Sequence, residues 1–258
     1  MNRGYHKWHS ASLDRDMELL IFGDSGARVI VFPTSCGRFY DWENREMIKC
    51  LEQPIEEGRI QLICVDSVDI ESWWNTTAHP SERAKRHLQY HTYIIDEVLP
   101  FTKKQNNSDT VIALGASMGA YHAMNLVLRF SDSFDKCLAF SGPYDFNQMS
   151  APYNVFSWIH EYTDENIQQC NPTPLVKSLS KAHVDKLKKV EITFPIGQTD
   201  PLYHGSQLLS AAMNEKGIPH QFITWDGFAH DWPYWQHMLH VYLVADESLK
   251  PKEKAQVK

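Results

Sequence analysis

Gly115-Ala116-Ser117-Met118-Gly119 is the stretch of this sequence that most directly indicates chemistry. A serine in the order G-x-S-x-G is typical of a nucleophile held on a sharp turn between a strand and a helix. The flanking residues fit that setting, because residues 111–114 are apolar and residues 120–128 contain no helix breaker. We therefore predict that Ser117 is a nucleophile that attacks a carbonyl carbon.

A serine hydroxyl becomes a good nucleophile only when a base removes its proton. Asp200 and His230 each follow a later apolar run, where they could supply the acid and the base that assist Ser117. Imidazole titrates near neutrality, so His230 could accept the serine proton while Asp200 orients the ring. The chain order serine, acid, histidine is that of the α/β-hydrolases. Asp145 and Asp226 are alternatives for the acid because each also lies close to a strand end.

Attack by a serine on a carbonyl creates an oxyanion, which backbone N–H groups can stabilise. Met118 is expected to give the first N–H, because it directly follows the nucleophile. The second should come from the loop after the apolar run 27–32. We choose Ser35 for this role, with its neighbours Thr34 and Cys36 as alternatives.

Short apolar runs alternate with helical patterns along most of the chain and must position these residues. Strands are predicted at residues 5–12, 17–22, 27–32, 60–65, 111–114, 136–140, 190–196 and 221–225. Helices are predicted at residues 42–52, 80–101, 202–216 and 229–243, and directly after Ser117. This alternation predicts a single α/β domain over residues 1–258, with a mostly parallel central sheet and helices on both faces. Residues 146–187 are expected to form a small irregular, lid-like insertion, and residues 246–258 a frayed tail.

Composition and charge narrow the class of protein. The 258 residues are 43% hydrophobic and 22% charged, which suits one sizeable globular core. The net charge of −7 argues against nucleic acid or an anionic membrane as a partner. The five cysteines lack a disulfide framework, and no apolar stretch resembles a secretory signal or a membrane span. We therefore expect a cytoplasmic protein with free thiols, and a homo-oligomer is compatible with the sequence.

No metal or cofactor is expected. His87 and His91 have the i, i+4 spacing of a helical metal site, but no third ligand is evident. Histidines packed in the core or facing solvent are the preferred interpretation of this pair.

Three segments resemble the esterase D and antigen 85 branch of the α/β-hydrolases, a family of esterases. Ser117-Met118-Gly119 resembles the S-M-G of that branch, Gly197-Gln198-Thr199-Asp200 its G-x-x-D turn, and residues 230–235 (HDWPYW) its H-x-W-x-Y-W segment. The resemblance extends over residues 20–245. The chain departs from the branch at Ala116 and Ala120, where histidine and glycine are more usual, and its residues 33–37 (PTSCG) lack a D-G or H-G opening.

These observations together favour a serine carboxylesterase that hydrolyses a small to medium carboxylic ester through an acyl-enzyme. Aromatic side chains are expected to line the substrate pocket, because ligand sites are mostly apolar; the candidates are Trp73, Trp74, Trp158 and Trp232. An acyltransferase or a thioesterase with the same Ser-His-Asp chemistry is the first alternative. A catalytically silent module that binds a small molecule is the second.

Overall fold

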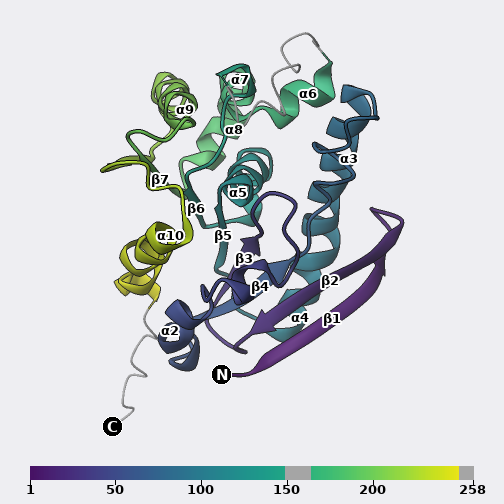
Figure 1. Ribbon diagram of the computed structural model, residues 1–258, viewed down its shortest axis with the longest axis vertical. Helices are drawn as coiled ribbons and strands as arrows, with labels where there is room; N and C mark the ends of the chain where they lie inside the picture. The colour runs from purple at the N-terminus through teal and green to yellow at the C-terminus, as the bar shows by residue number, and fades with distance from the viewer. Residues whose placement is uncertain (149–163, 250–258) are drawn as a thin grey trace.

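The computed structural model describes residues 1–148 and 164–249, which contain one twisted β-sheet with helices on both faces (Figure 1). The strands lie in the order β1-β2-β4-β3-β5-β6-β7-β8. Their bounds are Arg3–Ser10 (β1), Arg15–Phe22 (β2), Ala27–Phe32 (β3), Ile60–Val65 (β4), Val111–Ala116 (β5), Lys136–Phe140 (β6), Glu191–Gly197 (β7) and Gln221–Trp225 (β8). Each strand agrees with a predicted one to within two residues at either end.

The sheet is mostly parallel, as predicted. Strand β2 pairs antiparallel with β1 and with β4, whereas every neighbouring pair from β4 to β8 is parallel. The strands β3, β4, β5 and β6 are buried along their whole length, as expected for apolar strands covered by helices on both sides. Because parallel strands share one polarity, the carboxyl ends of β3, β5, β7 and β8 meet at the same edge of the sheet.

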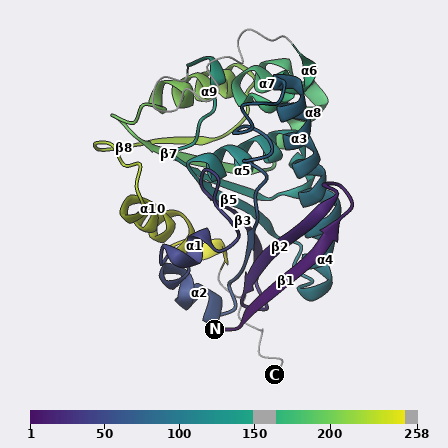
Figure 2. The same cartoon turned by 45° about the vertical axis from the view of Figure 1, so that its right-hand side comes forward.

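Helices cover the two faces unequally (Figures 1 and 2). Side chains of α3, α5, α7, α8 and α9 pack on one face, and those around α1, α2 and α10 pack on the other. The helix bounds are Asp41–Asn44 (α1), Glu52–Glu56 (α2), Pro80–Tyr93 (α3), Leu99–Gln105 (α4), Met118–Arg129 (α5), Glu165–Cys170 (α6), Pro172–Ser178 (α7), Lys181–Leu187 (α8), Tyr203–Glu215 (α9) and Trp232–Leu239 (α10).

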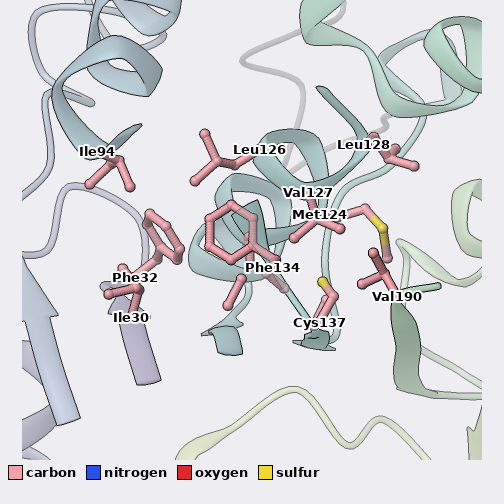
Figure 3. Packing of buried hydrophobic residues seen from close by; sticks show 14 of the residues in the cluster. Ile30, Phe32, Ile94, Met124, Leu126, Val127, Leu128, Phe134, Cys137 and Val190 are labelled. Carbon is pink, nitrogen blue, oxygen red and sulfur yellow. The ribbon is translucent and has the colours of Figure 1, made fainter. Parts of the chain in front are cut away.

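The larger apolar cluster lies between the sheet and α5. Ile30 and Phe32 of β3 and Met124 and Val127 of α5 are among its buried members (Figure 3). Burying one such side chain stabilises the fold by roughly 1.5–3 kcal/mol. The cluster therefore holds α5 firmly against the strands that precede the candidate catalytic residues.

Two predicted helices differ from the observed ones. The helix predicted at residues 42–52 is divided, because Glu46 adopts the left-handed backbone conformation (φ 58°) that ends α1. The helix predicted at residues 80–101 instead continues to Gln105, through a π-helical turn at Ile94–Val98. Pro100 has no N–H to donate to the preceding turn of the helix. The π-helical turn lies just before this proline, and the helix continues past Pro100 instead of ending there.

The predicted insertion at residues 146–187 is more regular than expected where the structure describes it. Residues 165–187 form the helices α6, α7 and α8. Leu175, Val176 and Leu187 belong to the main apolar cluster, so α7 and α8 are part of the layer that covers the sheet. Residues 149–163, including the predicted pocket residue Trp158, lie outside the described residues.

The cysteines are all free thiols, as predicted. Among residues 1–148 and 164–249, no helix is both long enough and apolar enough to pass through a membrane.

Candidate active site

Ser117 stands on a strained turn between β5 and α5. Its backbone has a positive φ (φ 54°, ψ −121°), which is unfavourable for a residue with a side chain, and its N–H donates to the carbonyl of Phe140 (2.8 Å). A Cβ on Gly115 would lie 2.2 Å from the carbonyl carbon of Gly119, and a Cβ on Gly119 would lie 2.4 Å from the carbonyl oxygen of Phe32. Both glycines are therefore required by close backbone contacts, and the predicted nucleophile turn is present.

Ser117, His230 and Asp200 form one continuous hydrogen-bonded chain. The distance between His230 Nε2 and Ser117 Oγ is 3.0 Å, and that between His230 Nδ1 and Asp200 Oδ2 is 2.7 Å. A carboxylate can only accept, so Nδ1 carries the proton and Nε2 is left to accept the proton of the serine hydroxyl. The side chains of Asp200 and His230 are both almost fully buried. This arrangement can deprotonate a serine as it attacks a carbonyl carbon.

The turns that carry the acid and the histidine are joined by backbone contacts. A Cβ on Gly197 would lie 2.1 Å from the carbonyl oxygen of Phe228, so only glycine allows the two turns to come this close. The N–H of Thr199 donates to the carbonyl of Gly227 (3.0 Å). Asp200 uses its second oxygen to accept the N–H of Leu202 (2.9 Å). The carboxylate of Asp200 is therefore held at both oxygens, by His230 at Oδ2 and by the Leu202 N–H at Oδ1.

The two alternative acids are placed differently. Asp145 is buried and accepts the N–H of Asn147 (3.0 Å), and burial raises the pKa of its carboxyl group. Asp226 is exposed. Of these three aspartates, Asp200 is the one that lies within hydrogen-bond distance of His230 (2.7 Å), so it is the strongest candidate for the acid.

Ser141 and Trp235 support the backbone next to His230, and the sequence interpretation gave neither of them this role. Ala229, the residue before the histidine, has a left-handed backbone (φ 43°). Its carbonyl accepts the hydroxyl of Ser141 (3.2 Å), and that hydroxyl oxygen accepts the indole N–H of Trp235 (3.2 Å). Both side chains are buried, and the Trp235 ring lies 5.3 Å from the imidazole. A short polar residue after β6 was visible in the sequence, but its partner 88 residues away was not.

Replacing Ser141 by alanine is expected to lower the free energy of unfolding by about 1–3 kcal/mol. The change leaves the buried indole N–H of Trp235 without its acceptor, and an unsatisfied buried donor costs about this much. Urea unfolding of the parent and the variant measures the difference. Ser133→Ala, a change at a partly exposed serine in the short 3₁₀ helix Ser131–Ser133, is the matched control. Equal stabilities of Ser141→Ala and the parent would contradict the supporting role.

The loop at residues 33–37, here called the oxyanion loop, is anchored by two carboxylates. The Thr34 N–H donates to Asp41 (3.0 Å) and the Cys36 N–H donates to Asp69 (2.9 Å). Ser35 is exposed between these two anchored amides, and its own N–H has no acceptor within the described residues. Thr34 and Cys36 are thus weaker candidates for the second donor than Ser35.

The oxyanion loop lies over the start of α5. The carbonyl oxygens of Phe32 and Pro33 would lie 2.4 Å and 2.7 Å from a Cβ on Gly119. Met118 begins α5, and N–H groups in a first helical turn have no acceptor within the helix.

Burial and the neighbouring Asp69 raise the pKa of the Cys36 thiol to about 11, so this cysteine is a poor nucleophile at neutral pH.

The predicted pocket residues do not share one environment. Trp73 is fully buried in a small cluster with Met118, so its ring offers no surface to a ligand in this structure, and that assignment needs correction. Trp74 packs at the border of the same cluster and Trp232 at the border of the second sheet face, both partly exposed. Phe228, which the sequence analysis did not select, is 45% exposed and its ring lies 5.7 Å from the ring of His230.

The histidines of α3 are core residues. His87 and His91 are both buried, and burial lowers the pKa of each well below its ordinary value. His87 lies within hydrogen-bond distance of Asn125 (3.1 Å) and His91 of Arg129 (2.6 Å). In the part of the chain that the structure describes, no group of three or more His, Cys, Asp or Glu side chains could hold a metal ion.

Three solved structures with a similar fold share less than 20% of their sequence with this chain. A ferulic acid esterase superposes with a TM-score of 0.72 at 18% identity, over 94% of this chain and 96% of that one. The serine hydrolase FphF of Staphylococcus aureus, described as fluorophosphonate-binding, gives 0.67 at 16% identity, over 97% and 99%. An S-formylglutathione hydrolase from Agrobacterium tumefaciens gives 0.70 at 13% identity, over 94% and 93%. These structures establish the α/β-hydrolase fold.

No curated protein sequence matches the chain significantly. The model of one protein family does match it, over residues 41–244, and that family is described as "Putative esterase". The matched region contains the serine turn, the acid turn and the histidine. The chain therefore belongs to this esterase family of the α/β-hydrolases and is a serine carboxylic ester hydrolase.

Proposed function

We propose that the protein hydrolyses a small to medium carboxylic ester through an acyl-enzyme formed on Ser117. His230 takes the hydroxyl proton as Ser117 attacks the carbonyl carbon, and the N–H groups of Ser35 and Met118 hold the oxyanion. The tetrahedral intermediate then collapses, and His230 gives the proton to the departing alcohol. Water, activated by the same imidazole, attacks the acyl-enzyme and releases the acid. Asp200 keeps the ring in the required tautomer throughout.

One observation carries this proposal: the uninterrupted chain from Ser117 Oγ through His230 to Asp200 Oδ2, with distances of 3.0 and 2.7 Å. The strained backbone at Ser117 supports the proposal. Such strain persists only where the surrounding structure holds it in place, and strained residues of this kind cluster at active sites. In the proposed reaction, nucleophilic attack and both proton transfers are assigned to these three side chains.

The direct test is labelling with a fluorophosphonate probe, followed by peptide mass spectrometry. The proposal expects one adduct per chain, on Ser117, and loss of ester hydrolysis in proportion to labelling. A protein that is folded but unlabelled would instead favour a module that only binds a small molecule. Turnover of a p-nitrophenyl ester with and without an added alcohol or thiol separates hydrolysis from acyl transfer, and matched oxygen and thiol esters identify a thioesterase.

The preference of the enzyme for short or long esters should depend on Trp74. A partly exposed aromatic ring beside the cluster of Met118 could contact the acyl or alcohol part of the ester. Trp74→Ala is expected to change the ratio of kcat/KM between short and long p-nitrophenyl esters by roughly 5- to 160-fold, since one apolar contact is worth roughly 1–3 kcal/mol of discrimination. Trp8→Ala, at the far edge of the sheet, is the matched control and should leave the ratio unchanged. An unchanged profile in Trp74→Ala would assign specificity to other residues, with Phe228 and Trp232 the next to test.

We further propose that the chain acts in the cytoplasm as a single domain, with a small-molecule ester and no nucleic acid or membrane as its partner. Its free thiols suit a reducing compartment, and its described elements pack on one sheet. A single cooperative unfolding transition and recovery in the soluble cell fraction are the expected results; several transitions or membrane association would contradict this. Light scattering of the purified protein distinguishes a monomer from a homo-oligomer.

A further inference from the structure

A second buried acid–histidine pair lies next to the oxyanion loop. Asp69 accepts the N–H of Cys36 with Oδ2 (2.9 Å) and hydrogen-bonds to Nε2 of His122 with Oδ1 (2.8 Å). The side chains of Asp69 and His122 are fully buried. His122 belongs to α5, the helix that Ser117 precedes. Asp69 therefore connects the loop that carries Ser35 to the helix that carries the nucleophile.

The backbone that this pair holds is strained. Cys36 has a left-handed backbone (φ 54°), which is unfavourable for a residue other than glycine. The N–H of this residue is the one that Asp69 accepts, so the carboxylate holds the loop in a conformation that it would otherwise leave. Asp41 holds the Thr34 N–H on the other side. Ser35 lies between the two anchored amides, and the direction of its N–H depends on both.

A carboxylate in the core is costly unless its charge is matched and its oxygens are hydrogen-bonded. Here one oxygen has the Cys36 N–H and the other has His122, whose ring is itself stacked on Phe32 and packed against Tyr90. These ring contacts fix the position of the imidazole, and the imidazole in turn orients the carboxylate of Asp69. This use of a histidine to orient an acid, and of the acid to fix an amide, suits a rigid oxyanion site.

We propose that Asp69 and His122 are positioning residues that hold the oxyanion loop so that the Ser35 N–H faces the hydroxyl of Ser117. This inference rests on the proposed function, because it concerns the oxyanion site of that reaction. Asp69 acts through the Cys36 amide and does not touch the substrate. Its removal weakens transition-state stabilisation while substrate binding stays nearly the same.

The test compares Asp69→Ala and Asp69→Asn with the parent. Alanine removes both hydrogen bonds, whereas an asparagine can still accept the Cys36 N–H and donate to His122 in its other tautomer. We expect kcat to fall roughly 10- to 100-fold in Asp69→Ala, somewhat less than the loss of a whole oxyanion donor, with KM within about threefold of the parent. Asp69→Asn should recover most of the lost kcat.

Two further variants separate positioning from stability. His122→Phe keeps a ring of similar shape but removes the hydrogen bond, and it should lower kcat about tenfold even if Asp69→Ala does not fold. Asp246→Ala removes a mostly buried carboxylate that pairs with Lys136 at the opposite end of the sheet (2.6 Å). It should lower thermal stability and leave kcat per folded molecule unchanged.

Hydrogen exchange gives a readout that does not depend on activity. Peptides covering residues 33–38 should exchange faster in Asp69→Ala and His122→Phe than in the parent or in Asp246→Ala. If both variants showed the kcat and the hydrogen exchange of the parent, the positioning role would be wrong. The proposed function would still stand in that case, provided that the fluorophosphonate labels the parent. A folded parent that is not labelled would overturn the proposed function, and this inference with it.

Discussion

Ser117→Ala is expected to lower kcat for a p-nitrophenyl ester by roughly 10³-fold or more, with the fold retained. The variant removes the hydroxyl oxygen that lies 3.0 Å from His230 Nε2, which is the proposed nucleophile. Alanine is smaller than serine and the Ser117 side chain caps no helix N–H, so no structural contact of α5 is lost. Initial rates with protein normalised by circular dichroism measure the effect.

The matched control for this prediction is Ser25→Ala, a serine in the turn before β3, at the opposite end of the sheet. It should react with the fluorophosphonate as the parent does, whereas Ser117→Ala should not react at all. Activity within a few-fold of the parent in Ser117→Ala would remove the nucleophile role. A low rate together with a changed circular dichroism spectrum would point to misfolding, and Ser117→Cys would then show whether a different nucleophile at this position becomes acylated.

Local patterns predicted the nucleophile turn well because its requirements are local. The serine, the two glycines, the apolar strand and the helix are contiguous, and each glycine is needed where backbones approach within a few ångströms. Asp200 and His230 were predicted for a related reason. Each follows a strand, and parallel strands bring their carboxyl ends to one edge, so the topology places distant residues together. The sequence favoured Asp200 over Asp145 and Asp226, and the structure places Asp200 2.7 Å from Nδ1 of His230.

The supporting residues could not be predicted, because their partners are far apart in the chain. Asp69 and His122 are separated by 53 residues, and Ser141 and Trp235 by 94. Nothing in the sequence indicates that these side chains meet, because the two members of each pair lie in different segments and no local pattern links them. Trp73 shows the opposite failure: an aromatic residue in a loop was assigned to the pocket, but its ring is buried in a packed cluster. Composition alone does not distinguish these two environments.

Asp200→Asn is expected to lower kcat by on the order of 10⁴-fold, through the wrong tautomer of His230. An asparagine can donate its amide N–H to Nδ1, which moves the imidazole proton to Nε2, the atom that must accept the serine proton. The size of the side chain is unchanged, so the turn that joins Gly197 to Phe228 should stay intact. Initial rates and thermal unfolding of the same preparations measure the two effects separately.

Two matched substitutions make the prediction specific to the acid. Asp145→Asn and Asp226→Asn change the alternative carboxylates in the same way, yet neither side chain holds His230, and both should cost far less activity. A second prediction follows for labelling: without the correct tautomer, the rate of fluorophosphonate reaction at Ser117 should fall in Asp200→Asn only. If Asp145→Asn showed the largest loss in both measurements, the acid would be Asp145, and the bond between Asp200 and His230 would serve only to join the two turns.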